Sequence, residues 1–169
     1  IKTLQHPTVA SKSFLITIGD RTVGGMVARD QFIGPFQVPV SDYSLSLRSF
    51  TSTTGEVLSI GEKPTLALTN PAASMRMALA EALTNMIGVV IKGLNYVQVS
   101  ANWMAASGEK QQDIALRDGV EALSKMSVDL KVSIPVGKDS LSMKTKWSDN
   151  GNELEVTSPL SGVITAMAP

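Results

Sequence analysis

The sequence predicts an α+β fold built on a mixed or antiparallel sheet. Apolar segments with the length and alternation of strands outnumber the segments with helical spacing. The two kinds of segment follow one another in a mixed order, whereas a parallel α/β protein would alternate them strictly. We expect the helices to lie on one face of the sheet.

The longest helical pattern runs from Pro71 to Gly93. Asn70 can cap its first turn, and Pro71 suits the first helical position, where a missing N–H has no cost. Gly93 is the expected stop. The apolar residues recur at three- and four-residue steps and form one stripe, made of Met75, Leu79, Leu83, Met86 and Val90.

The same helical pattern places Glu81 and Asn85 side by side, because they are four residues apart. Their neighbours on this face are small, namely Ser74, Ala78 and Gly88. A carboxylate and an amide among small residues leave room for a ligand. The alternative is a solvated helix face, which is the commoner origin of such a pair.

The rest of the chain supplies a second helix and the strands. The helix is predicted over Gln112–Ser127, while residues 19–35, rich in glycine, and the polar residues 59–65 are interpreted as connections. An Asp149-Asn150-Gly151 turn predicts a hairpin. The strands are predicted over Phe14–Ile18, Gln37–Phe50, Leu94–Ser100, Leu130–Ile134, Ser142–Trp147, Glu153–Thr157 and Gly162–Ala168.

The apolar phase of the strand predicted over 37–50 reverses near Ser41 and Asp42. Apolar residues occupy even positions before this point and odd positions after it, at Tyr43, Leu45 and Leu47. A reversal of phase exposes a whole face unless the strand is interrupted. We therefore predict a bulge or a functional kink at this position.

Composition excludes several classes of protein. The 15 basic and 15 acidic residues balance, so no bulk charge attracts nucleic acid or an anionic membrane. The absence of cysteine removes disulfides, thiolate zinc sites and cysteine nucleophiles, and the single histidine excludes a histidine-rich metal site. No apolar run has membrane-spanning length and no signal peptide is evident, so we expect a cytoplasmic protein.

We expect residues 1–169 to form a single domain cut from a larger, multidomain protein. The length suits one domain with a sizeable core. The sequence starts at Ile1 without an initiator methionine and stops at Pro169, just after an apolar strand pattern.

The sequence does not match the common nucleotide-binding and hydrolytic motifs. Gly137-Lys138-Asp139-Ser140 is similar to the end of a P-loop, but Val132 stands where the earlier glycine is required. No G-x-G-x-x-G follows a predicted strand. A Ser–His–Asp triad would need His6, which lies next to Pro7 near the terminus and is better interpreted as a surface residue.

The remaining candidates are oxygen ligands. Asp42, Glu81 and Asn85 supply two carboxylates and an amide carbonyl, which are hard ligands suited to Mg²⁺ when phosphate oxygens complete the octahedron. In the alternative interpretation, Asp42 merely ends a strand and the charges of the glycine-rich loop, including Asp20 and Arg29, face solvent. The residues alone leave both interpretations open.

Four strings resemble phosphoribosylformylglycinamidine synthase of the large, single-chain type: GDRTVGGMVARDQFIGPFQVPVSDYSL, EALTN, SANWMAA and PVGKDSLSMKTKW. The resemblance covers about His6 to Ala168. It implies a part of an ATP-dependent amidoligase of de novo purine biosynthesis, which makes formylglycinamidine ribonucleotide from formylglycinamide ribonucleotide, ATP and glutamine. It also implies the N-terminal α+β subdomain of the second of two aminoimidazole ribonucleotide synthetase-like halves, a subdomain that pairs its sheet with a counterpart.

The resemblance also implies functions for individual residues. In the family, the second half holds an auxiliary nucleotide, ATP or ADP, with magnesium. The matching positions are Asp42, Glu81 and Asn85 as metal ligands and Ser41 against the nucleotide, and none is catalytic. Ala80 stands where the family pattern has glycine. A further aspartate ligand and a nucleotide-contacting serine belong to the following subdomain.

The sequence is compatible with two classes of function. The chain is either a working part of the ligase or a purely structural pairing domain without turnover. A small homodimeric synthetase of the same superfamily is a third alternative, disfavoured by the strings specific to the second half. The implied partners are ATP or ADP and the remaining domains of the parent, including its glutaminase domain. The isolated fragment is expected to be inactive and to form a homodimer, with no nucleic acid or membrane partner.

Overall fold

The computed structural model describes residues 1–19, 21 and 25–169. The chain divides into two compact units, residues 1–56 and residues 57–169. Among the described residues, no helix is long and apolar enough to cross a membrane.

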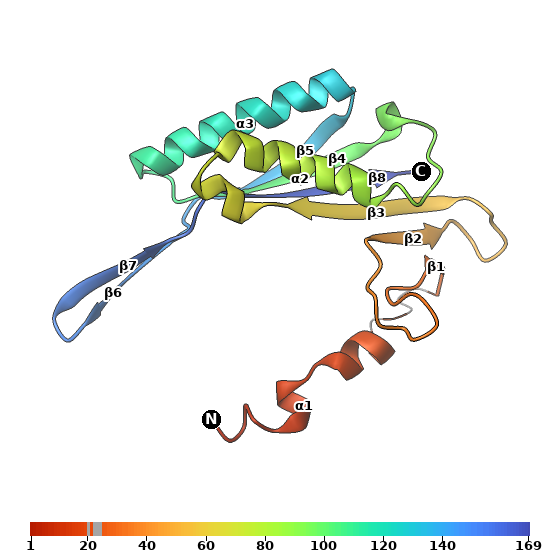
Figure 1. The fold of residues 1–169 in the computed structure, drawn as a ribbon, viewed down its shortest axis with the longest axis horizontal. Helices are drawn as coiled ribbons and strands as arrows, with labels where there is room; N and C mark the ends of the chain where they lie inside the picture. The colour runs from red at the N-terminus through yellow and green to blue at the C-terminus, as the bar shows by residue number, and fades with distance from the viewer. Residues whose placement is uncertain (20, 22–24) are drawn as a thin grey trace. The chain divides into compact units, whose positions relative to one another are not determined.

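The second unit is built on a sheet whose strands follow the order β3-β8-β4-β5. β3 begins at the boundary between the units and pairs antiparallel with β8, which pairs antiparallel with β4, whereas β4 and β5 are parallel. Figure 1 shows the strands side by side. The mostly antiparallel sheet confirms the predicted α+β class. The strands span Gly55–Glu62 (β3), Gln98–Met104 (β4), Ser133–Ser140 (β5) and Ser161–Ala168 (β8).

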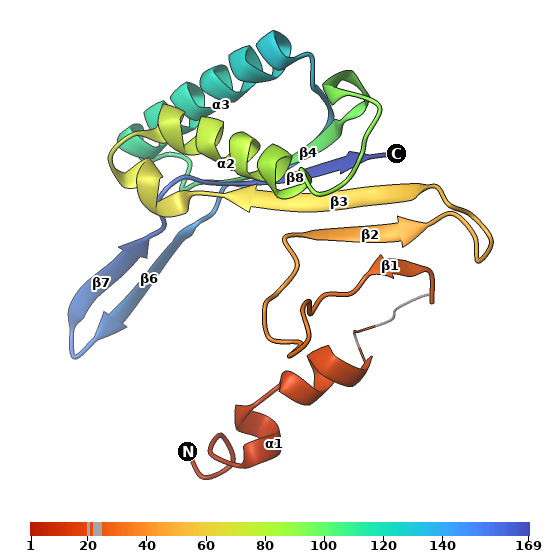
Figure 2. The same ribbon diagram turned by 45° about the vertical axis from the view of Figure 1, so that its right-hand side comes forward.

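Two helices, α2 (Pro71–Asn85) and α3 (Lys110–Leu130), cover one face of this sheet. Both views show the helices on the same side (Figure 1, Figure 2). Alternate strand residues, such as Val57, Val99 and Ile164, are buried beneath the helices. Met75 and Leu79 of α2 and Leu123 of α3 complete this core. The sequence prediction of helices on one face is therefore confirmed.

The other face of the sheet exposes apolar side chains. Leu58 and Ile60 of β3 are 40% and 50% exposed, and Met167 of β8 is 39% exposed. The register places Leu58 opposite Met167 and Ile60 opposite Thr165, so these residues share one face. We call Leu58, Ile60 and Met167 the open face.

The predicted hairpin is confirmed as β6 (Lys144–Asp149) and β7 (Asn152–Thr157), which form a separate two-stranded sheet. Asn150 and Gly151 have φ values of 51° and 79°, as a two-residue turn of the hairpin type requires. Lys144 ties the hairpin to the start of α3 through Glu109, at 2.7 Å between Nζ and Oε1.

The first unit contains short elements. They are α1 (Pro7–Ala10), a π-helical turn η1 (Leu15–Gly19), and the antiparallel strands β1 (Val27–Arg29) and β2 (Tyr43–Leu47). The loop predicted over residues 19–35 is in part outside the described residues, namely at 20 and 22–24. Its described part contains β1, which the sequence analysis missed.

Several expected boundaries were wrong. The apolar run 14–18 forms part of a helical turn, because a short apolar run does not distinguish strand from buried helix by periodicity. The strand expected over 37–50 is confined to β2. Val40 makes an isolated bridge to Phe32, so the change of phase at Ser41 and Asp42 marks the start of the strand and not a bulge within it.

The polar connection predicted at 59–65 is wrong as well. Residues up to Glu62 continue β3, and only then does the 3₁₀ helix η2 (Pro64–Leu68) begin. β3 was missed because Ser59 and Gly61 are buried by α2, so its buried face carries small and polar residues that do not show as an apolar pattern.

Both helices also differ from prediction in length. α2 ends at Asn85 and not at Gly93. The residues beyond, from Ile87 to Ile91, are mostly β-branched with one glycine, which disfavours helix, and Val90 is fully exposed. α3 continues to Leu130 and ends at Lys131 in the left-handed region, with φ 57°, so the next strand starts at Ser133 and not at Leu130. The strand expected from Leu94 starts at Gln98, after the 3₁₀ helix η3 (Leu94–Tyr96).

Candidate functional site

The candidate site is built where α2 packs against the end of β3. Gly61 makes this approach possible, since a Cβ there would collide with the Ala78 carbonyl oxygen and the Ala82 nitrogen. Two serine hydroxyls tie the elements together. Ser59 Oγ donates to the Ala82 carbonyl oxygen, and Ser74 Oγ donates to the Lys63 carbonyl oxygen, both at 2.6 Å. The site therefore rests on two rigid elements.

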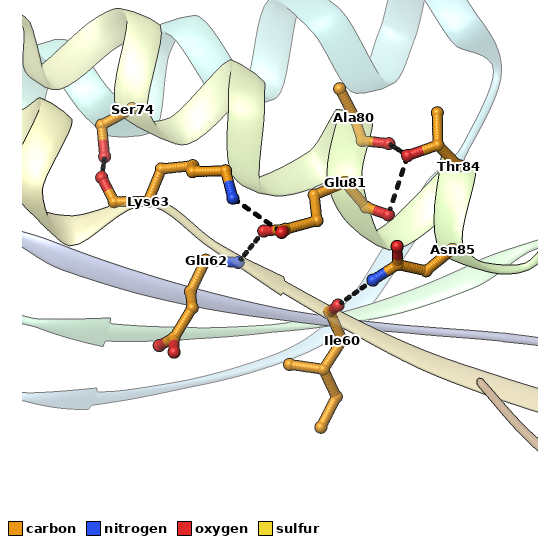
Figure 3. A network of polar contacts seen from close by, with 8 residues as sticks. All are labelled: Ile60, Glu62, Lys63, Ser74, Ala80, Glu81, Thr84 and Asn85. Atoms are coloured by element: carbon orange, nitrogen blue, oxygen red, sulfur yellow. Dashed lines mark hydrogen bonds and ion pairs between the residues drawn. The ribbon is translucent and has the colours of Figure 1, made fainter. Parts of the chain in front are cut away.

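Glu81 points from α2 toward this strand end, where both of its carboxylate oxygens are engaged (Figure 3). The backbone N–H of Glu62 donates to Oε2 at 2.9 Å. The Lys63 ammonium lies 2.6 Å from Oε1. These contacts, the one from Lys63 first, hold the pKa of Glu81 below its ordinary value of 4.5, so the carboxylate is charged at neutral pH.

Asn85 lies one helical turn further along and reaches the same strand. Its Nδ2 donates to the Ile60 carbonyl oxygen at 2.9 Å, which turns its amide oxygen Oδ1 away from that carbonyl (Figure 3). Ile60 and Glu62 are two residues apart, so the Ile60 carbonyl oxygen and the Glu62 N–H, which bond Asn85 and Glu81, point to the same edge of β3. The predicted proximity of Glu81 and Asn85 is thus seen in the structure.

Ser41 and Asp42 lie in the first unit, immediately before β2. The Ser41 N–H donates to the Gln31 carbonyl oxygen, and its hydroxyl donates to the Tyr43 carbonyl oxygen, both at 2.8 Å. Glu81 and Asn85 lie in the second unit. Within the second unit the structure brings together Glu81 and Asn85, two of the three expected metal ligands, and the convergence of Asp42 with them stays a prediction.

Ser41 borders a pocket of about 290 Å³ within the first unit. Arg29 lines it with its guanidinium 5.3 Å from the centre of the Tyr43 ring, and its buried Nε has no hydrogen-bond partner in the part of the chain that the structure describes. Arg21 lines it too and pairs with Asp30 at 2.7 Å. Because Asp30 offsets the charge of Arg21, the positive charge that Arg29 brings to the pocket lining would favour an anion.

The oxygen atoms of the Glu81 and Asn85 side chains suit a hard cation more than a transition metal. Among the described residues, no three His, Cys, Asp or Glu side chains form a cluster that could hold a metal ion. What α2 offers is one carboxylate and one amide oxygen, which fit Mg²⁺ when other oxygens complete its shell. The Lys63 ammonium against Glu81 shows that this position already attracts a positive charge.

Sequence reasoning did not find Lys63. Its segment was interpreted as a connection, so nothing linked this residue to the end of a strand beside α2. The charge at Arg29 was noted, but the stacking of Arg29 on Tyr43 depends on the pairing of β1 with β2, which was not foreseen.

Comparisons with known proteins agree with this architecture. Residues 11–169 match the family model described as FGAR-AT PurM_N-like domain. The PurL structure from Thermotoga maritima complexed with ADP is similar at a TM-score of 0.55 and 16% identity, covering 76% of this chain and 20% of that one. The PurLQS structure from the same organism gives a TM-score of 0.55 and 15% identity, covering 83% of this chain and 24% of that one.

The sheet and its two helices belong to a domain of the aminoimidazole ribonucleotide synthetase N-terminal type. More narrowly, the chain belongs to the FGAR-AT PurM_N-like domain family, since the family model matches nearly all of it. The resemblance noted in the sequence is thereby confirmed. The chain spans about a fifth of the length of the PurL structures that it matches.

Proposed function

We propose that the chain is one domain of an ATP-dependent amidoligase that converts formylglycinamide ribonucleotide, ATP and glutamine to formylglycinamidine ribonucleotide in the cytoplasm. Its family membership supports this. The fold that the chain shares with the T. maritima PurL structures complexed with ADP, with ATP and with FGAR is consistent with it. The other domains of the parent, including a glutaminase domain, would supply the catalytic residues.

In this proposal the chain contributes half of an auxiliary Mg²⁺–nucleotide site. The observation that carries it is the pairing of Glu81 and Asn85 at one end of β3, held by the Glu62 N–H and the Ile60 carbonyl. Glu81, Asn85 and Asp42 would hold the metal. When bound, Mg²⁺ would neutralise phosphate charge. The chain's own contribution is to fix the two α2 side chains before any ligand arrives.

The pocket in the first unit supports the nucleotide part of the proposal. Ser41, assigned to the nucleotide by resemblance, lines this pocket together with Arg21 and Arg29. Guanidinium groups recognise phosphate through charge-assisted hydrogen bonds. The buried Arg29 Nε, which has no hydrogen-bond partner among the described residues, is a donor suited to such an anion.

A structural pairing domain without turnover is the second candidate, and the open face favours it. Leu58, Ile60 and Met167 leave apolar surface on the sheet face that the helices do not cover. A counterpart sheet in the parent would bury this surface. The two candidates are compatible, because a nucleotide can hold paired subdomains together without being consumed.

Calorimetry tests the proposed site. ADP with Mg²⁺ is titrated into the chain and into the chain extended through the following subdomain, which would complete the ligand set. We expect binding, stronger in the extended form, and a loss of more than about tenfold in Glu81→Gln, because even residues that only orient metal ligands typically contribute that much. Glu121→Gln, at an exposed acid of α3, is the matched control. Equal binding by Glu81→Gln and Glu121→Gln would overturn the assignment.

A further inference from the structure

Lys63 lies where the end of β3 packs against α2, a contact that we call the α2–β3 seam. It directly follows β3 and precedes η2, so its backbone is fixed on both sides. The Ser74 hydroxyl anchors its carbonyl oxygen at 2.6 Å. Its side chain extends along the seam to Glu81 and is 39% exposed, so the anchored backbone carries a side chain that can move into solvent (Figure 3).

The two oxygens of Glu81 are held in different ways. Oε2 accepts from the Glu62 N–H, a backbone group of the strand that cannot move without disturbing the sheet. Oε1 accepts from the Lys63 ammonium, at the end of a chain with four rotatable bonds. A cation that approaches this carboxylate can therefore displace only the contact at Oε1.

We propose that Lys63 is a built-in counter-cation, which occupies the Glu81 carboxylate when no metal is present and competes with a divalent cation for Oε1. This inference rests on the proposed metal site. Because two positive charges repel each other at one oxygen, the ammonium must swing out when the metal binds. Lys63 then serves two purposes: it stabilises the metal-free protein, and it limits the affinity of the site.

A positioning function for Lys63 makes the opposite prediction. If the ammonium only holds Glu81 in a binding-ready orientation, its loss would disorder the carboxylate and weaken metal binding. The structure argues against this, since the Glu62 N–H orients Glu81 independently and Asn85 is fixed by the Ile60 carbonyl. The sign of the change in affinity separates the two functions.

The test titrates Mn²⁺, as a paramagnetic substitute for Mg²⁺, into the chain and follows free Mn²⁺ by electron paramagnetic resonance. Lys63→Met keeps the apolar stem and removes the charge. We expect it to bind Mn²⁺ roughly three- to tenfold more tightly than the wild type, from the lost ion pair and the relieved repulsion. Lys63→Arg keeps the charge and should bind no more tightly than the wild type. Lys125→Met, at an exposed α3 lysine, controls for net charge.

The melting temperature without metal gives a second readout, and circular dichroism confirms that each variant folds. We expect Lys63→Met to melt below the wild type in the absence of Mn²⁺ and to regain more stability when Mn²⁺ is added. If Glu81→Gln weakens Mn²⁺ binding while Lys63→Met binds like the wild type or more weakly, the inference is overturned and the proposed site stands. If Glu81→Gln binds as well as the wild type, the proposed site falls, and the inference with it.

Discussion

No side chain fits between Gly61 of β3 and the Ala78 carbonyl oxygen of α2. This close approach sets the height of the helix above the strand. It lets Ser59 reach the Ala82 carbonyl and lets Glu81 reach the Glu62 N–H. The geometry of the candidate site therefore depends on one glycine that is not itself a ligand.

We predict that Gly61→Ala destabilises the protein by about 1–3 kcal/mol, because the added methyl group meets backbone atoms that cannot yield. Gly162→Ala is the matched comparison in the neighbouring strand β8. Its added methyl group would meet only the flexible end of the Met75 side chain, which can move. Urea unfolding should show the larger loss for Gly61→Ala, and equal losses would contradict the proposed backbone contact.

A helix cap offers a second stability test. The Asn70 Oδ1 accepts from the Ala73 N–H at 2.9 Å, as predicted from the sequence. We expect Asn70→Ala to cost about 1 kcal/mol, as removal of a helix N-cap typically does, and Asn70→Ser to cost less. Thermal unfolding of the two variants measures this. An Asn70→Ala protein as stable as the wild type would show that the cap contributes nothing.

Acid should weaken the contact between the hairpin and α3. The hydrogen bond from Lys144 holds the pKa of Glu109 below its ordinary value of 4.5, with Lys146 adding to the effect and Asp113 opposing it. Lys144 also pairs with Glu155 at 2.9 Å. A lowered folded-state pKa means that this stabilisation is present above the unfolded value and is lost as the pH falls through the folded value.

The measurement compares the urea midpoints of the wild type and Glu109→Gln as a function of pH. We predict that the wild type is more stable at neutral pH and that the difference shrinks as the pH falls below about 4.5, the ordinary pKa that Glu109 has in the unfolded chain, toward its lower folded-state pKa. A difference that stays constant down to about pH 3 would show that the charge of Glu109 does not stabilise the fold.

The open face should drive self-association of the isolated chain. Burying an aliphatic side chain contributes about 1.5–3 kcal/mol, so Ile60→Lys should weaken a dimer through this face by more than about tenfold. Sedimentation at high concentration measures the dimer. Val128→Lys, at an exposed position of α3, is the control. A wild-type chain that remains monomeric, or a dimer that Val128→Lys weakens equally, would contradict the assignment of this face.

The features that could be predicted from the sequence are the local ones. The Asn70 cap, the Asn150-Gly151 turn and the proximity of Glu81 to Asn85 each depend on residues a few positions apart. Each of them follows from local backbone geometry, which the types of the neighbouring residues largely determine. β8 could be predicted as well, because its residues alternate between buried and more exposed positions along the strand.

The features that were missed depend on distant residues. β3 is a strand because it pairs with β8 at the far end of the chain, and its Gly61 is required by the packing of α2. Nothing local marks either fact. Lys63 joins the candidate site for the same reason, because its importance follows from the place where β3 ends.

The central claim is that the chain holds an auxiliary nucleotide site whose metal is bound in part by Glu81, and its most direct test is Glu81→Ala in the full-length parent. The measurement is the rise in melting temperature on adding ADP and Mg²⁺, together with the turnover number of the folded enzyme. A ligand that binds only the native state stabilises it by about 2.7 kcal/mol at 100 times its Kd, so we predict that most of this rise disappears while turnover survives. A variant that keeps the full rise and loses its turnover by orders of magnitude would contradict the account.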